Sequence, residues 1–215
     1  MQDRISLVVA TRNPGKTAEI RELLKNFPVD IKNFDDFGSI PEIEEDGDTF
    51  DENAYKKASF ASQILGLPAL ADDSGLVVEF LGGMPGVHSA RYAGEDASDE
   101  DRYRKLLKEL EGAANRNAAF ECVISIAVPE GSALTYEGRC EGKIAEKPEG
   151  KNGFGYDPVF YFPDYNKTFA QLTMEEKSLV SHRGKALREV ASEFDKVMTW
   201  IRQHMSVMEK FDCKR

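Results

Sequence analysis

An apolar segment runs into a polar turn in Ile5-Ser6-Leu7-Val8-Val9-Ala10-Thr11-Arg12-Asn13-Pro14-Gly15-Lys16. Residues 5–10 are apolar and partly β-branched, which predicts a buried strand. Four apolar residues then recur at helical spacing, namely Ile20, Leu23, Leu24 and Phe27. The order of strand, turn and helix is typical of an α/β protein.

Capping patterns mark the starts of further helices. Thr49 and Glu52 form a capping-box pattern, and the helix that follows is expected to end near Leu65, before Gly66. Similar pairs are expected to start two other helices, at Ser98 with Asp101 and at Thr173 with Glu176. One long C-terminal helix is predicted by an apolar face that comprises Leu187, Val190, Ala191, Phe194, Val197, Met198 and Ile201.

The remaining strands are predicted by short apolar or alternating runs. Strands are expected at 68–71 and 76–80, on either side of a turn formed by Asp72-Asp73-Ser74-Gly75. Two longer runs at 118–128 and 133–144 are separated by a proline- and glycine-containing turn, which predicts a long hairpin. A hairpin added to strand–helix units makes the sheet mixed.

The composition is that of a soluble globular protein. Of 215 residues, 41% are hydrophobic and 31% charged, enough for one large domain or two small lobes; residues 1–205 are interpreted as this domain, and residues 206–215 as a polar tail. No run approaches the roughly 18 apolar residues of a membrane span, so a cytoplasmic location without membrane contact is expected. Three scattered cysteines suggest neither disulfides nor zinc. A formal charge of −10 argues against nucleic-acid binding.

The first polar turn imitates a phosphate-binding P-loop. Gly15-Lys16-Thr17 matches the end of that motif, but Ala10 stands at its first glycine and Pro14 removes a backbone N–H group. The shorter turn that remains can still hold an anion with helix amides and three side chains, Thr11, Asn13 and Lys16. An ordinary polar turn is the alternative.

Two acidic segments are candidates for a cation site. Glu44-Glu45-Asp46-Gly47-Asp48 places four carboxylates in five residues, without the spacing of a calcium-binding EF-hand, so most of them can be a solvated loop. One of them is expected to meet Asp72 or Asp73, since Mg²⁺ takes one or two carboxylates with phosphate oxygens and water. Side chains alternate along strands, so one aspartate is expected to point into a cleft. A turn or cap is the alternative.

Two later segments can recognise a purine. Gly153-Phe154-Gly155-Tyr156-Asp157-Pro158 is no dinucleotide fingerprint, because Pro158 replaces its third glycine. Phe154 or Tyr156 can lie flat against a base, or either ring can belong to the core. In Ser181-His182-Arg183-Gly184, an arginine aimed at C6 favours the keto group of hypoxanthine or xanthine over the amino group of adenine. A lone histidine at a helix start is usually a cap or a surface residue.

Six segments occur in one order along the chain: residues 8–16, residues 44–54, ADDSGL, GGMPGVHSARYAG, GFGYDP and SHRGKAL. In this order they resemble the Ham1-like inosine and xanthosine triphosphate pyrophosphatases, which convert non-standard purine triphosphates into monophosphates. The resemblance extends from about Leu7 to about Arg188. It implies an α/β fold with a long mixed sheet, flanking helices and two lobes around a central cleft, and it implies a homodimer.

The resemblance also implies roles for single residues. Thr11, Asn13 and Lys16 match the family's T-x-N-x-x-K phosphate pattern, and Lys57 matches a helix lysine that faces the polyphosphate. The ligands of Mg²⁺ are expected to be Glu44, with Glu45 as the alternative, and Asp73, which is either a ligand or the catalytic base. The other substrate contacts are expected from Ser74, Phe154, Gly155, Tyr156, Asp157, Lys177, His182 and Arg183.

The expected reaction is Mg²⁺-dependent attack of water on the α-phosphorus of ITP, dITP or XTP, which releases pyrophosphate and a nucleoside monophosphate. Two other classes remain as alternatives: a P-loop-like NTPase that releases the terminal phosphate, and a non-enzymatic nucleotide-sensing module. Ala10 and Pro14 weigh against the first. The aspartate pair at 72–73 weighs against the second, since binding alone does not need adjacent carboxylates.

Overall fold

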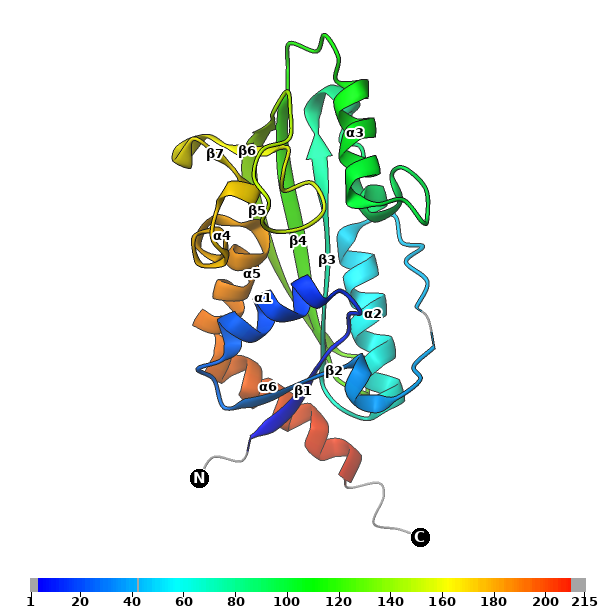
Figure 1. Ribbon diagram of the computed structural model, residues 1–215. Coiled ribbons are helices and arrows are strands. Elements are labelled where there is room, and N and C mark those ends of the chain that lie inside the picture. Colours follow the sequence, from blue (N-terminus) through cyan, green and yellow to red (C-terminus); the bar gives the residue numbers. More distant parts are fainter. Residues whose placement is uncertain (1–3, 42, 210–215) are drawn as a thin grey trace. The chain divides into compact units, whose positions relative to one another are not determined.

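The computed structural model describes residues 4–41 and 43–209, with the side chains of all of these except 23 and 206–209 (Figure 1). The chain divides into two compact units. The first unit comprises the described residues up to Asp73, Val123–Tyr136 and those from Ala186 onward, and the second comprises Ser74–Cys122 and Glu137–Lys185. No helix in the described part of the chain is long and apolar enough to cross a membrane.

The strands in the described residues form one sheet of seven, in the order β2-β1-β3-β4-β5-β6-β7. Strand β1 (Ile5–Val9) is parallel to β2 (Val29–Asn33) and to β3 (Ala69–Val78). Strand β6 (Phe160–Phe162) is antiparallel to its neighbours β5 (Ala133–Ile144) and β7 (Lys167–Thr168). The predicted α/β class with a mixed sheet is therefore confirmed.

Helices α1 (Pro14–Leu24) and α2 (Phe50–Leu65) of the first unit begin where their capping residues indicate. The Asn13 side chain caps α1, and the Thr49 hydroxyl caps α2 by accepting from the Glu52 amide. Gly66 ends α2 at a φ of 65°, a left-handed conformation that suits glycine. Small residues let α2 pack closely on the strands in a core that includes Val8, Ala10, Ala58, Ala61, Ala69 and Ala71.

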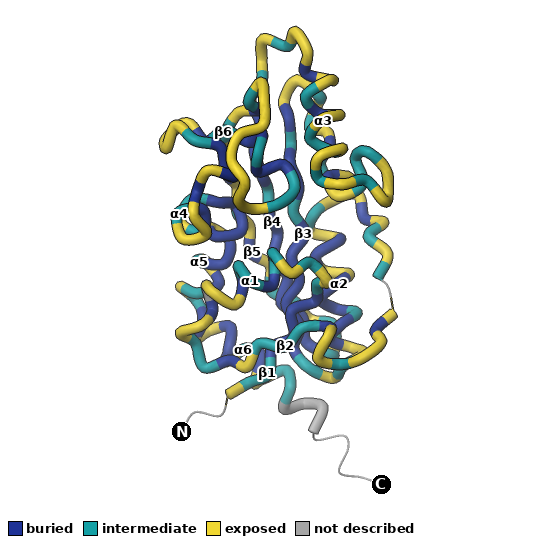
Figure 2. The backbone as a smooth tube through the Cα atoms, in the orientation of Figure 1, coloured by how far each residue is buried: buried dark blue, intermediate teal, exposed yellow. Residues whose placement is uncertain are grey.

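Strand β3 is uninterrupted where the sequence suggested two strands and a turn (Figure 1). Asp72, Asp73, Ser74 and Gly75 all lie inside it, so the predicted turn is wrong. The strand is buried along nearly all of its length (Figure 2). Buried carboxylates in a strand are unfavourable unless they are paired, and here each aspartate has a lysine partner on a helix that is remote in sequence.

The second unit is built around phenylalanine rings. The ring centroid of Phe120, in β4 (Asn117–Ala127), lies 4.6 Å from that of Phe160 and 5.9 Å from that of Phe169.

Strands β4 and β5 are sheet neighbours joined by a short turn, as the predicted hairpin requires. Helices α3 (Asp99–Glu109) and α4 (Met174–Val180) both start with the capping boxes that the sequence predicted.

Two helices occupy the C-terminal region in place of the single predicted one. Helix α5 (His182–Ser192) and helix α6 (Phe194–Glu209) are separated at Glu193, whose amide is shared between two carbonyls of the preceding turn. Most of the predicted apolar face is buried, and Ala191 is half-buried. Helix α6 passes the predicted boundary at 205, and residues 210–215 of the predicted tail lie outside the described residues.

Short 3-10 segments complete the described structure, at Phe34–Phe37, Glu79–Leu81, Gly86–Arg91, Pro163–Tyr165 and Phe169–Gln171.

Candidate active site

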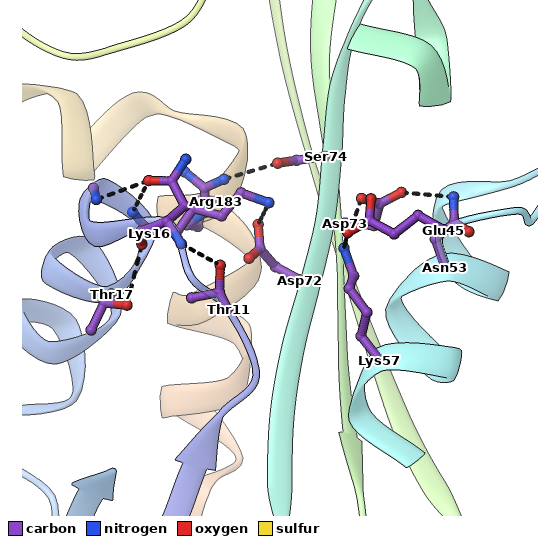
Figure 3. A network of polar contacts seen from close by, with 12 residues as sticks. Thr11, Lys16, Thr17, Glu45, Asn53, Lys57, Asp72, Asp73, Ser74 and Arg183 are labelled. Atoms are coloured by element: carbon purple, nitrogen blue, oxygen red, sulfur yellow. Dashed lines mark hydrogen bonds and ion pairs between the residues drawn. The ribbon is translucent and has the colours of Figure 1, made fainter. Parts of the chain in front are cut away.

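The turn between β1 and α1 is held by its own side chains (Figure 3). The Thr11 hydroxyl accepts from the Asn13 amide at 3.1 Å. The Asn13 carboxamide oxygen accepts from the amides of Gly15 and Lys16 at 2.9 and 3.2 Å. These first amides of α1 therefore already have an acceptor within the chain. The turn carries two positive charges: Arg12, which donates to the Ile40 carbonyl at 2.6 Å, and Lys16.

Asp72 and Asp73 extend from opposite sides of β3 (Figure 3). Asp72 pairs with Lys16 at 3.1 Å, and Asp73 pairs with Lys57 of α2 at 3.0 Å. The two carboxylates are only 1% and 8% exposed, and each is paired with a cation, which offsets the cost of burying a charge. The alternation expected of a strand thus separates the two aspartates and gives each its own lysine.

Lys57 joins Asp73 to the acidic loop. Its ammonium group lies 3.0 Å from one Asp73 oxygen and 2.9 Å from a Glu45 oxygen. Glu45 is therefore the loop carboxylate that shares a partner with Asp73, whereas Glu44 is exposed. The preceding residue, Lys56, pairs at the surface with Asp46 at 2.6 Å. Of these two consecutive lysines of α2, Lys56 is therefore exposed and Lys57 is buried.

Asn53 is a residue of this cluster that the sequence analysis missed. Its side-chain nitrogen donates to the second Asp73 oxygen at 3.2 Å, and its oxygen accepts from the Gly47 amide at 2.8 Å. A side chain at Gly47 would collide with Asn53. Asn53 therefore ties Asp73 to the acidic loop. A signal was present, since asparagine is disfavoured inside helices and this one lies four residues before Lys57 on α2.

Burial and charge oppose each other in this cluster. Burial raises the pKa of Asp73 above its ordinary value, although the charges of Lys57 and Lys16 act to lower it. Burial on its own would lower the pKa of Lys57, but the carboxylates of Asp73, Glu45 and Asp72 outweigh it and hold that pKa above its ordinary value. Lys57 is therefore a cation at neutral pH, beside a carboxylate of increased basicity.

The 153–157 loop of the second unit is organised by the carboxylate of Asp157. One oxygen of this carboxylate accepts from the Phe154 amide at 2.9 Å and from the Lys177 ammonium group at 2.7 Å. Both charged side chains are buried. Gly153 has a φ of 78°, and a side chain there would collide with the Asp157 carboxylate. The loop is therefore held by a buried ion pair that only glycine at 153 leaves room for.

Two cations face the half-buried ring of Phe154. The Lys177 nitrogen lies 4.8 Å from the ring centroid, and the central guanidinium carbon of Arg183 lies 5.9 Å from it. Arg183 is 2% exposed and donates to the Ser74 hydroxyl at 2.8 Å. The second unit thus gathers an aromatic face, two cations and a hydroxyl, which suits a flat base that carries keto oxygens.

A protein-family model described as the Ham1 family matches residues 7–193. The chain belongs to the Ham1 family. A dITP/XTP pyrophosphatase of Desulfotalea psychrophila is 58% identical to this Ham1-family chain, over 93% of the chain and 90% of the relative. One of Geobacter sulfurreducens is 54% identical, over 84% of the chain and 92% of the relative.

Solved structures of Ham1 proteins are similar as well. A HAM1 protein from Coxiella burnetii has a TM-score of 0.83 and 45% identity, covering 89% of this chain and 99% of that one. The Ham1 protein of Staphylococcus aureus has a TM-score of 0.81 and 39% identity, covering 89% of this chain and 98% of that one. The resemblance recognised in the sequence is therefore confirmed.

Two residues expected at the substrate lie in the core of this Ham1-family chain. Tyr156 is 4% exposed, and its hydroxyl donates to the Ser89 carbonyl at 2.9 Å. The His182 ring is buried and stacks on Phe120, with centroids 4.7 Å apart and planes at 15°. Tyr156 thus has the core position that the sequence left open, and His182 begins α5 from inside the core.

Magnesium fits the donors around Asp73. The carboxylates of Asp73 and Glu45 lie on either side of one ammonium group, and Mg²⁺ uses one or two protein carboxylates together with phosphate oxygens and waters. Within residues 4–41 and 43–209, no group of three or more His, Cys, Asp or Glu side chains could hold a metal ion. The donors suit an ion shared with a phosphate better than one held by protein alone.

Proposed function

We propose that this protein is a hydrolase that converts dITP, XTP and ITP into the nucleoside monophosphate and pyrophosphate. Its relatives of 54 and 58% identity are named dITP/XTP pyrophosphatases. The observation that carries the proposal lies on β3, where residues two positions apart share a side of the strand. Asp72 pairs with Lys16, and Ser74 accepts from Arg183, which faces the ring of Phe154. This strand therefore contacts both a lysine that suits a phosphate and the residues that suit a base.

We assign the charged cluster to the triphosphate; it comprises Lys16 with Asp72 on one side of β3, and Lys57 with Asp73, Glu45 and Asn53 on the other. Lys16 and Lys57 are cations paired with carboxylates, and phosphate oxygens compete for such ammonium groups. Positive charge at fixed positions stabilises the charge that develops on the departing pyrophosphate. Thr11 and Asn13 shape the turn that places Lys16 at the start of α1.

The reaction is the attack of water on the α-phosphorus. A new P–O bond forms while the bond to the bridging oxygen of the β-phosphate breaks, and the water gives up its proton. Asp73 has two candidate roles, as acceptor of that proton or, with Glu45 or Glu44, as ligand of Mg²⁺. Bound Mg²⁺ would neutralise phosphate oxygens and acidify a coordinated water. In either role Lys57 and Asn53 hold the two oxygens of Asp73 in place.

We assign the aromatic cluster, which comprises Phe154, Lys177, Arg183 and Ser74, to the base. The Phe154 ring offers a stacking face, and Arg183 and Lys177 offer donors beside it. A keto oxygen at C6 of hypoxanthine or xanthine accepts from such donors, whereas the amino group of adenine leaves donor facing donor. Each unpaired buried group costs about 1–3 kcal/mol, which corresponds to a preference of roughly 5- to 150-fold.

Incubation with ITP and Mg²⁺, followed by separation of the products, tests the proposal. IMP with pyrophosphate is the expected result. IDP with phosphate would instead indicate a terminal NTPase, and unchanged ITP with measurable binding would indicate a nucleotide sensor. ATP, tested in parallel at the same concentrations, is expected to be a poorer substrate than ITP.

Three further statements belong to this proposal. Activity is expected to require Mg²⁺, which removal by EDTA and stepwise return will measure. The protein is expected to be a homodimer, which light scattering during gel filtration will measure. It is expected in the cytoplasm, where the nucleotide pool is found, and cell fractionation will show whether it is there.

A further inference from the structure

A carboxylate remote in sequence reaches the loop that carries Phe154. Asp99, the first residue of α3, accepts a hydrogen bond from the Gly155 amide at 2.7 Å. Both residues belong to the second unit, 56 positions apart. The charge of the acceptor strengthens this bond, and the 45% exposure of the Asp99 side chain allows water to screen part of that effect.

Arg102 anchors this carboxylate from its other side. Its guanidinium group donates to the second Asp99 oxygen at 2.7 Å and to the Ala97 carbonyl at 2.6 Å. The Arg102 side chain is about one-fifth exposed. Both Asp99 oxygens are therefore engaged, one with the loop and one with an arginine that is itself held by the backbone.

Helix capping does not explain Asp99. Ser98 and Asp101 form the capping box of α3, in which the Ser98 hydroxyl accepts from the Asp101 amide and Asp101 accepts from the Ser98 amide. An acidic residue in the first turn is favourable in general, but this general effect requires no contact with a distant loop. The Asp99 contact with Gly155 is therefore an additional feature of this fold.

The loop needs anchors because glycines flank its aromatic residue. Gly153 and Gly155 have φ values of 78° and 62°, in the left-handed region. Two consecutive peptide N–H groups set the backbone of Phe154: its own, which donates to Asp157, and the next, that of Gly155, which donates to Asp99. Two carboxylates from different parts of the chain therefore fix the backbone on both sides of the ring.

We propose that Asp99, braced by Arg102, is a positioning residue that fixes Phe154 for stacking on the purine base. The inference rests on the proposed function and extends it, since it assigns part of the base recognition to a residue outside the loop. Loss of the bond leaves the Phe154–Gly155 peptide held only through its carbonyl, which accepts from the Asp157 amide at 3.2 Å. Substrate binding should weaken, while the groups assigned to the phosphates, Lys16 and Lys57, are unaffected.

The test compares Asp99→Ala with Asp101→Ala, a matched control that removes the capping box from the same helical turn. Asp99→Ala is expected to raise the KM for ITP about tenfold and to leave kcat within about twofold, the pattern of lost uniform binding. Asp99→Asn keeps an oxygen that can accept from Gly155 but places an NH2 group opposite the Arg102 guanidinium. Its KM should therefore lie between those of the wild type and Asp99→Ala. Asp101→Ala should leave the KM unchanged.

Hydrogen exchange gives a readout that does not depend on catalysis. The Gly155 amide, followed in a peptide covering 153–157, is expected to exchange faster in Asp99→Ala than in the wild type or Asp101→Ala. An unchanged KM and unchanged exchange in Asp99→Ala would overturn the inference, as would equal shifts in both variants. If Asp99→Ala does not fold, Arg102→Gln replaces it, with a KM increase of about threefold expected and no change refuting the idea. Failure of the wild type to hydrolyse ITP would refute the proposed function, and the exchange data would still decide the role of Asp99.

Discussion

Replacement of Lys57 by methionine tests the charged cluster directly. Methionine keeps most of the length of the lysine side chain but removes its charge, so Asp73 remains 8% exposed without its cation. Removing one partner of a buried ion pair typically destabilises a protein by 3–5 kcal/mol. Asn53 still donates to Asp73, so a loss of about 3 kcal/mol, at the lower end, is expected. For a chain of this length that corresponds to a melting temperature lower by roughly 6–12 °C.

Thermal unfolding without Mg²⁺ or nucleotide, followed by circular dichroism at pH 7.5, measures this loss. Lys56→Met is the matched control, because it removes a lysine one position earlier whose ion pair with Asp46 is at the surface. The double variant Lys57→Met with Asp73→Asn should regain part of the loss, since it removes the uncompensated charge. A Lys57→Met protein that melts together with Lys56→Met would refute the reasoning.

Three other outcomes are expected. Gly153→Ala should lower the free energy of unfolding by about 1–3 kcal/mol and abolish most ITP binding, because the left-handed backbone and the nearby Asp157 carboxylate leave no room for a methyl group. Urea unfolding measures the stability and steady-state kinetics with ITP measures the binding. A variant with unchanged stability and KM would contradict the loop geometry. Tyr156→Phe should lower the free energy of unfolding by about 1–2 kcal/mol, because the Ser89 carbonyl loses its hydrogen-bond donor. The KM for ITP should not change; an increased KM would place Tyr156 at the substrate instead. Burial raises the pKa of the Cys140 thiol to about 11, so iodoacetamide at pH 8 should modify it only after unfolding, as mass spectrometry of its peptide will show.

Local sequence signals predicted the starts of α2, α3 and α4 correctly. The capping residues at Thr49, Ser98 and Thr173 act on amides within three residues, so their information is contained in a few adjacent letters. The break between α5 and α6 at Glu193 was not predicted, because the apolar face continues across it. A periodic pattern indicates which side chains are buried. It does not indicate where the backbone hydrogen bonding between two consecutive helices is interrupted.

Longer-range contacts explain the other differences. The acidic pair was expected in a turn because its compensating lysines lie 56 and 16 residues away in sequence, at Lys16 and Lys57. Asp99 carried no signal of its own, since a neighbouring capping box already accounts for acidic residues there. The roles that the family resemblance implies for single residues remain predictions.

The uninterrupted course of β3 through Asp72 and Asp73 has a consequence for how this gene can vary. Side chains on a strand change sides at every position, so one residue gained or lost just before Asp72 would turn each carboxylate to the side opposite its lysine partner and turn Ser74 away from Arg183. A substitution in this strand removes one of these contacts, whereas an insertion or deletion disrupts the contacts of Asp72, Asp73 and Ser74 together. Insertions and deletions that natural homologues tolerate should therefore fall outside this strand.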